Sequence, residues 1–155
     1  MAVRRAVESD LKNIKMLIDR NFDEVMSKYH SIEVIKRFKE HNSIGSLKNQ
    51  LYWKKTYVAE DAEIITGTGA FANFGSEEQP KYSVSNLYVL PDFHGKGVGT
   101  QIMNALIADA KEHRAETFHV PSSRNAVSFY EMFGFAIDDL QPDTIDEITW
   151  MTMTL

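Results

Sequence analysis

Apolar residues in the first third of the chain follow the spacing of one short strand and two helices. Residues 3–7 form a short strand-like run, and Ser9 is placed to cap the helix that follows it. Beyond Ser9, apolar residues recur every three or four positions, which gives each predicted helix one apolar face. The first helix is expected to bury Leu11, Ile14, Leu17 and Ile18, and the second, from about Ser31, to bury Ile32, Ile35 and Phe38.

The period changes in the middle of the chain, where strands replace helices. Residues 56–60 and 64–73 are predicted to be two strands, and the short turn between them favours antiparallel pairing. Gly67 and Gly69 lie inside the second strand and indicate a bulge or a bend. A polar loop follows, and residues 83–90 are predicted to form a third strand.

The last part of the chain predicts two more helices and three more strands. The helices are expected from Thr100 to about Ala115 and over residues 125–133, with Gly134 as the C-terminal cap of the second. Strands are expected at residues 117–120, 135–140 and 145–154. The whole pattern predicts an α/β fold of the α+β type, with a mixed, mostly antiparallel sheet of about six to seven strands and about four helices.

Composition narrows the classes of function. The chain of 155 residues has no cysteine, which excludes disulfides and zinc–thiolate sites, and its five histidines show no metal-binding spacing, so no metal is expected. A net charge of −5 argues against nucleic acid and suits a cationic amine, although it would equally keep any protein soluble. We expect a single domain over residues 1–155, located in the cytoplasm, because neither a signal peptide nor a membrane-spanning run is recognisable.

The loop at residues 91–99 carries the strongest chemical signal. Glycines stand at positions 95, 97 and 99, between a predicted strand and a predicted helix. Glycine tolerates positive φ and has no Cβ to block a ligand, and a helix N-terminus offers unpaired N–H groups and partial positive charge. The loop therefore predicts a phosphate cradle, although its spacing matches neither the P-loop nor the dinucleotide-binding pattern. The alternative is a tight turn without a ligand.

Residues 87–100 resemble the main acyl-CoA motif of the GNAT acetyltransferases. In that motif a strand and a proline lead into [Arg/Gln]-x-x-Gly-x-[Gly/Ala]. Gly97 and Gly99 match the two small positions, whereas His94 stands where the family usually has Arg or Gln.

Two further segments resemble the same family. Residues 125–135 are similar to its Ala-x-x-[Leu/Phe]-Tyr-x-x-x-Gly-Phe helix, and the first residues are similar to its opening strand and helix. Many members carry Asn where this chain has Ser123, so either Ser123 or Asn125 could contact the cofactor. Only the segment from about residue 22 to residue 53 is unmatched.

The resemblance implies a single GNAT-like domain whose central strands are splayed to admit CoA. It implies acetyl-CoA as the co-substrate and direct attack on its thioester by a primary amine of a small molecule or peptide. The residues then expected to bind the cofactor are Leu87, Tyr88, Val89, His94, Gly95, Lys96, Gly97, Val98, Gly99, Thr100, Asn125 and Phe129.

Tyr130 is the catalytic residue that the resemblance implies. The matching tyrosine of the family donates a proton to the departing thiolate, and a phenol with pKa near 10 is protonated at neutral pH. The backbone N–H of Val89 is expected by the same analogy to polarise the thioester carbonyl. The alternative for Tyr130 is a side chain that only packs beside Phe129 and Phe133.

Other features of the reaction stay open in the sequence. The central strand offers no carboxylate as general base, so Glu60 on a neighbouring strand or a water relay would have to serve. Tyr29, His30, Tyr52 and Trp53 could line an acceptor pocket or simply be partly buried rings. The alternative function is an acyl-CoA-binding sensor or partner module with little catalysis. The closing strands provide an edge that could pair in a homodimer.

Overall fold

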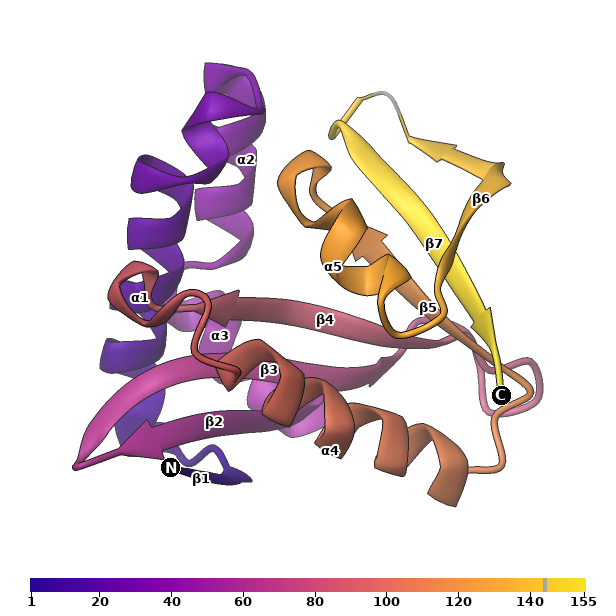
Figure 1. Cartoon of the computed structure of the whole chain (residues 1–155), viewed down its shortest axis with the longest axis horizontal. Helices are drawn as coiled ribbons and strands as arrows, with labels where there is room; N and C mark the ends of the chain where they lie inside the picture. The colour runs from indigo at the N-terminus through magenta and orange to yellow at the C-terminus, as the bar shows by residue number, and fades with distance from the viewer. Residues whose placement is uncertain (144) are drawn as a thin grey trace.

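The computed structural model describes residues 1–143 and 145–155, and for Pro142 and Asp143 the backbone alone. Its central feature is one seven-stranded sheet in the order β1-β2-β3-β4-β5-β7-β6 (Figure 1). All neighbours pair antiparallel except β4 and β5, which run parallel. The strands are β1 Ala2–Arg5, β2 Lys55–Asp61, β3 Ile64–Asn73, β4 Tyr82–Val89, β5 Thr117–Ser122, β6 Ala136–Asp143 and β7 Ile148–Thr154.

Helices cover both faces of this sheet. Because neighbouring strand residues point to opposite faces, Val58 packs in a cluster with α1 and Ala59 packs in a cluster with α4. Tyr130 of α5 belongs to the second cluster, so α4 and α5 lie on one face and α1 and α3 on the other. The helices are α1 Leu11–Glu24, α2 Ile32–His41, α3 Ile44–Trp53, α4 Val98–Glu112 and α5 Val127–Glu131, with short 3-10 turns η1 Glu8–Asp10, η2 Met26–Lys28, η3 Pro91–Phe93 and η4 Arg124–Ala126.

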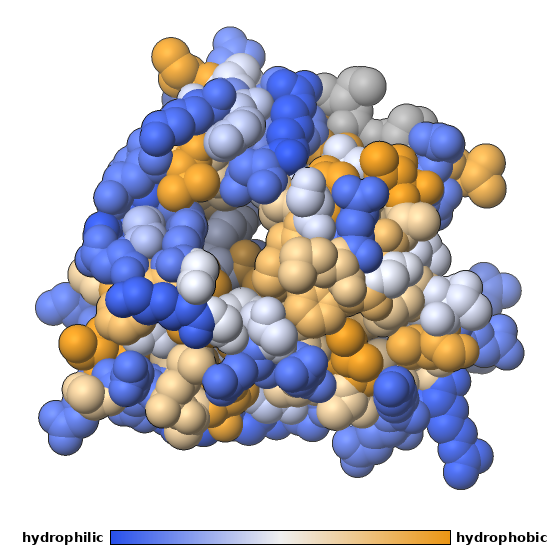
Figure 2. All heavy atoms as spheres, in the orientation of Figure 1, coloured by the Kyte–Doolittle hydropathy of each residue, from blue (hydrophilic) through white to orange (hydrophobic). Residues whose placement is uncertain are grey.

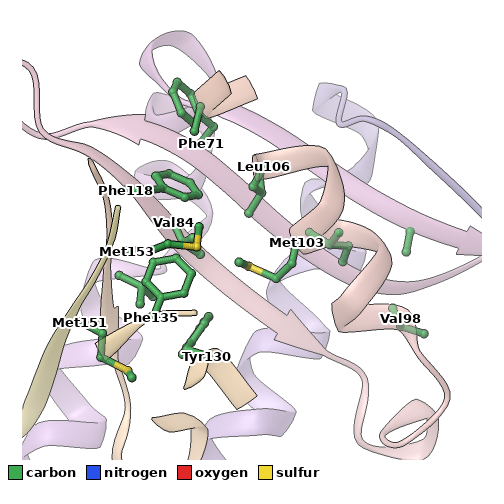
Figure 3. Close-up of a cluster of buried hydrophobic side chains, with 14 residues drawn as sticks. Phe71, Val84, Val98, Met103, Leu106, Phe118, Tyr130, Phe135, Met151 and Met153 are labelled. Atoms are coloured by element: carbon green, nitrogen blue, oxygen red, sulfur yellow. The ribbon is translucent and has the colours of Figure 1, made fainter. Parts of the chain in front are cut away.

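The core on the α4 face holds the two halves of the sheet together. Phe118 of β5 and Phe135 pack at a ring separation of 5.9 Å, and Met103 of α4 is fully buried beside them (Figure 3). Burying a side chain of this size contributes about 2–3 kcal/mol. The same cluster contains Tyr130, which ties α5 to the core.

The two parallel strands separate toward their carboxyl ends. Within the described part of the chain β4 and β5 pair at one position, Ser83 with His119. Beyond this point the ribbons of β4 and β5 diverge (Figure 1). The predicted fold, including the splayed central strands, is confirmed.

The prediction of a bulge in β3 is also confirmed: Ala59 of β2 pairs with Gly67 and Glu60 with Ile65, so Thr66 is the extra residue. A second register shift, between β3 and β4, places its extra residue on β4.

The structure also explains the two glycines of β3. A Cβ on Gly69 would lie 2.6 Å from Cγ2 of Ile102, and one on Gly67 would lie 2.8 Å from a methyl group of Val98. Glycine is needed here because α4 crosses the strand too closely for a side chain.

Three local predictions were wrong. Ser9 lies inside η1 and does not cap α1; the Asp10 carboxylate instead accepts the N–H of Val7 at 2.8 Å. Ile32 is the first residue of α2 and 89% exposed, since its position faces away from the core. The last helix ends at Glu131, two residues early, although Gly134 does adopt the expected positive φ, 102°.

The structure also contains a helix that the sequence pattern did not predict, α3. Leu47 is its single buried residue, so its apolar periodicity is too weak to be recognised. Its cap is visible in the sequence: Ser43 Oγ accepts the N–H of Ser46 at 3.2 Å. None of the helices in residues 1–143 and 145–155 has the length and apolar character required to cross a membrane.

Candidate active site

A cavity of about 750 Å³ opens where β4 and β5 separate. Its walls come from β4 and β5, from the glycine loop and the start of α4, from residues 123–130 around η4 and α5, and from the α1–α2 side of the molecule. Figure 2 shows the hollow between that side and α5. Such a volume accommodates a ligand larger than a single metabolite ring.

The glycine loop forms one end of this cavity. Gly95 and Gly97 have φ of 74° and 82°, and Gly97 is the left-handed residue that directly precedes α4. A Cβ on either would meet no atom within 4 Å, so backbone conformation, rather than crowding by the protein, requires glycine there. The first turn of α4 has neither an acidic residue nor a side-chain cap, which leaves its N–H groups available to an anion.

The lining residues explain why backbone groups must bind the anion. Among the described residues that line the cavity there is no lysine or arginine, and Asp146 is the one carboxylate. Lys96, inside the loop, does not line the cavity; its Nζ lies 5.1 Å from the ring centre of Phe93. A phosphate group here would therefore be held mainly by N–H groups and by the helix dipole.

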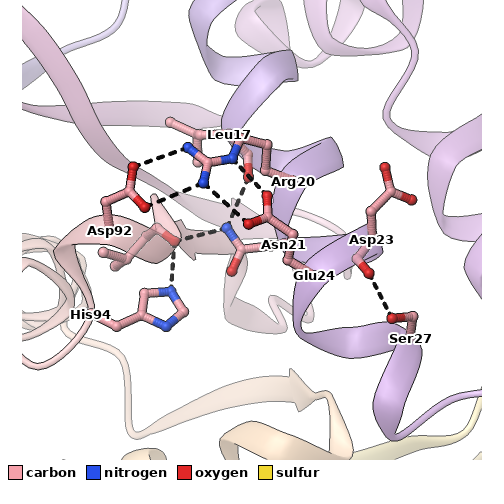
Figure 4. A network of polar contacts seen from close by, with 9 residues as sticks. Leu17, Arg20, Asn21, Asp23, Glu24, Ser27, Asp92 and His94 are labelled. Carbon is pink, nitrogen blue, oxygen red and sulfur yellow. Dashed lines mark hydrogen bonds and ion pairs between the residues drawn. The ribbon is translucent and has the colours of Figure 1, made fainter.

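Side chains anchor the loop to β4 and to α1. The carbonyl oxygen of Val89 accepts hydrogen bonds from His94 Nε2 at 2.7 Å and from Asn21 Nδ2 at 2.8 Å (Figure 4). Arg20 donates to Asp92 at 3.3 Å on the outer side. His94 thus fixes the loop to the strand that precedes it.

Tyr130 lies in the cavity wall on α5. It is 5% exposed and meets the ring of Phe129 edge-on at 5.3 Å. Burial raises the pKa of its phenol above the usual range, and the nearby Tyr88 acts in the same direction. The hydroxyl is therefore protonated at any physiological pH and is able to donate a proton to a base.

The structure brings the predicted cofactor residues together. All of them except Lys96 line the cavity, and so do both Ser123 and Asn125. Gly99 allows close packing with Phe129, since a Cβ there would lie 3.1 Å from that ring. Glu60 does not line the cavity: it lies on β2 and accepts a hydrogen bond from Arg4 at 2.9 Å.

Sequence reasoning missed the other end of the cavity. Its wall there consists of residues from η2, α2, the segment after β3, and β4: Met26, Phe38, His41, Asn42, Phe74, Ser85 and Asn86. Asn42 donates to the carbonyl of Phe38 at 2.8 Å, and its buried Oδ1 has no partner among the described residues. A local pattern carries no signal for these positions, because they meet only in the folded chain.

The four rings that the sequence left as either pocket-lining or simply partly buried do not line the cavity. Tyr29, His30, Tyr52 and Trp53 are absent from the lining, although Trp53 packs edge-on against Phe74 at 5.9 Å. His30 is buried, and desolvation lowers its pKa although Glu147 opposes the shift. Glu147 accepts the N–H of Ser31 at 2.9 Å, which joins the segment before β7 to the start of α2.

Comparison with known proteins places this geometry in a family. A family model described as the acetyltransferase (GNAT) domain matches residues 25–155. Since this match covers most of the chain, the chain belongs to the GNAT family of acetyltransferases. The resemblance seen in the sequence is confirmed.

Individual relatives are distant in sequence and close in fold. An uncharacterized N-acetyltransferase ycf52 of Porphyra purpurea is 24% identical over 96% of this chain and 91% of its own length. The crystal structure of PaiA N-acetyltransferase from Thermoplasma acidophilum, in complex with coenzyme A, superposes with a TM-score of 0.84 at 17% identity, covering 99% and 98% of the two chains. A GCN5-related N-acetyltransferase from Rhodopseudomonas palustris gives 0.83 at 21% identity over 99% and 95%.

Proposed function

We propose that this protein transfers the acetyl group of acetyl-CoA to a primary amine. The observation that carries the proposal is the placing of three features in one cavity: an unblocked helix N-terminus behind a glycine loop, two diverging parallel strands, and a buried, protonated tyrosine. Family membership and the CoA-bound structures with the same fold support it.

The cofactor would lie along β4 with its pyrophosphate at α4. The N–H groups from Gly95 to Thr100 would hold the pyrophosphate, and the pantetheine arm would occupy the gap between β4 and β5. In the pairing of β4 with β3, the register passes from Ser85 directly to Tyr88, so the residues between them form a bulge on β4. Asn86, inside this bulge, has a positive φ of 51°. This bulge leaves backbone groups of β4 outside the ladder, next to the place where the thioester carbonyl needs a donor.

The reaction then requires one proton donor and one proton acceptor. The amine nitrogen bonds to the acetyl carbon, the C–S bond breaks, and Tyr130 gives its proton to the sulfur of CoA. The nitrogen loses a proton in return. The raised pKa of Tyr130 suits a group that must be protonated before the reaction and must recover its proton from solvent afterwards.

Binding and turnover test this proposal separately. Acetyl-CoA is titrated calorimetrically into the protein, with CoA, ATP and NAD as comparison ligands, and a thiol-release assay then surveys a panel of amines. We expect micromolar binding of acetyl-CoA, no heat from ATP or NAD, and turnover of at least one amine. Binding without turnover of any amine would favour a cofactor-binding sensor, and no binding of acetyl-CoA or CoA would refute the proposal.

A homodimer and a cytoplasmic location stay predictions from the sequence, and the identity of the acceptor amine stays open. Among the fully buried side-chain atoms of the described lining, Asn42 Oδ1 alone has no hydrogen-bond partner. No cluster of three His, Asp or Glu side chains that could hold a metal occurs in the described ranges. The proposed chemistry accordingly uses the chain's own donors and acceptors.

A further inference from the structure

Lys54 is a buried lysine directly behind the wall of the cavity. It follows α3 and is 9% exposed. Its Nζ donates to Ser85 Oγ at 2.8 Å and to Gln50 Oε1 at 2.9 Å, and it lies 4.8 Å from the ring centre of Trp53. None of the ion pairs formed between described residues includes Lys54.

A charged lysine in such a place lowers the stability of the fold. An ammonium group that is removed from water without an anion tends to lose its proton. The hydrogen-bond and ring partners of Nζ are all neutral: Gln50 and Trp53 of α3, Ser85 of β4, and Phe74 after β3. Desolvation is accordingly the one cause that lowers the pKa of Lys54, to about 8.

Ser85 connects this lysine to the reaction space. It is a residue of β4, it lines the cavity, and of the two hydrogen-bond partners of Lys54 it is the one that does so. No carboxylate lies on β4, and the one carboxylate of the described lining, Asp146, is bound by Arg37 at 2.9 Å. On β4 the cavity therefore offers, in place of a carboxylate base, the Ser85 hydroxyl, which is hydrogen-bonded to a lysine that can lose its proton.

We propose that Ser85 and Lys54 form the proton relay that deprotonates the acceptor amine. As the nitrogen bonds to the acetyl carbon, it passes one proton to Ser85 Oγ, while the Ser85 hydroxyl proton moves to Nζ of neutral Lys54. The Lys54 ammonium afterwards releases this proton to solvent, and Tyr130 recovers from solvent the proton it gave to sulfur. This relay rests on the proposed acetyl transfer, and within it Lys54 is a positioning residue that acts through Ser85.

The protonation equilibrium of Lys54 suits this task. With a pKa of about 8, about a quarter of the molecules hold neutral Lys54 at pH 7.5, against about 0.1% for an unperturbed lysine. A base whose pKa lies near the working pH combines availability with proton affinity. A lysine that only packed against Trp53 and Phe74 would gain most from staying charged, because cation–π attraction requires the charge.

The test compares pH profiles of turnover for four proteins with the same amine: wild type, Lys54→Met, Ser85→Ala, and the control Lys48→Met. Lys48 is an exposed lysine of α3 that pairs with Glu8 at the surface. We expect a limb near pH 8 in kcat of the wild type and of Lys48→Met. Loss of this limb, and a fall of kcat on the order of 100-fold, is expected in the other two. A double variant, Lys54→Met with Ser85→Ala, should lose no more turnover than either single variant, since each substitution interrupts the same relay.

Two further measurements separate this relay from a structural role. Lys54→Arg keeps a buried cation that cannot release its proton, so it should not restore turnover. A heteronuclear NMR titration of the Lys54 side chain should give a midpoint near 8 even without an acceptor.

The failures of the two proposals are distinguishable. If wild type turns over an amine, any of three results would overturn the relay alone. They are a full pH limb in Lys54→Met, rescue of turnover by Lys54→Arg, and a Lys54 titration midpoint above 10. A wild type that binds no acetyl-CoA would overturn the acetyltransferase proposal and the relay with it.

Discussion

Replacing Lys54 by methionine is expected to stabilise the fold at neutral pH, even though it should impair turnover. The folded protein lowers the pKa of Lys54 from 10.5 to about 8 because the side chain is desolvated. A shift of this size corresponds to about 3 kcal/mol of destabilisation when the group is charged in both states. Methionine has a similar length and carries no charge to desolvate.

The net effect is smaller than this figure because the lysine also makes two hydrogen bonds. Losing the bonds from Nζ to Ser85 and Gln50 costs about 1 kcal/mol each, and Gln50 Oε1 keeps its bond from Asn86. We therefore expect Lys54→Met to raise the free energy of unfolding by about 1–2 kcal/mol at pH 7. Such a gain from an impaired site is the usual trade-off between stability and activity.

The pH dependence isolates the charge from everything else that the substitution changes. Between pH 8 and pH 10.5 the unfolded chain holds more protons at residue 54 than the folded protein does, so wild-type stability rises with pH in this window. The destabilisation of wild type by the charge falls to about 1 kcal/mol at pH 10. The advantage of Lys54→Met over wild type should accordingly shrink by about 2 kcal/mol from pH 7 to pH 10.

Urea unfolding of both proteins at pH 7 and pH 10 measures this difference directly. Lys48→Met serves as the control, because Lys48 is exposed and should show no comparable change. A variant that is less stable than wild type by the same amount at both pH values would refute the reasoning. It would mean that Lys54 contributes through its contacts and carries no desolvation penalty.

Four more predictions test other parts of the structure. Tyr130→Phe should lower kcat on the order of 100-fold with little change in KM for acetyl-CoA, measured by thiol release; unchanged turnover would remove Tyr130 from the chemistry. Gly97→Ala should destabilise the fold by about 1–2 kcal/mol in thermal melts and weaken acetyl-CoA binding, because alanine is strained at a φ of 82°. The control Gly45→Ala, inside α3 with free space around it, should be neutral or slightly stabilising in the same melts. Gly69→Val should cost several kcal/mol in urea unfolding, since α4 leaves no room for a side chain. In wild type, stability should fall as pH drops below 6.5, because the lowered pKa of buried His30 favours its neutral form. His30→Gln should weaken this pH dependence of stability. An unchanged slope in the variant would contradict the assignment to His30.

Sequence alone located the features that depend on neighbours in the chain. Alternation and glycine spacing identified β2, β3 and the cradle before α4, because pleat, helix period and positive φ are local properties. The family motifs indicated the expected cofactor residues and Tyr130 for the same reason, since these residues lie on two short continuous segments; all but Lys96 line the cavity. The errors at Ser9 and Ile32 arose at helix ends, where periodicity gives the least information.

Only the tertiary structure decided which residues lie at the proposed site of the reacting amine. Glu60 was the sequence candidate for the base, but the sheet order places it on β2 beside Arg4, with β3 between it and β4. Ser85 and Lys54 are 31 positions apart, and neither residue type signals a base. Their pairing requires α3 to end against β4, and the neutral surroundings that lower the lysine pKa come from packing of the whole chain. Burial is a property of the fold, so the proton chemistry that depends on burial could not be predicted from sequence.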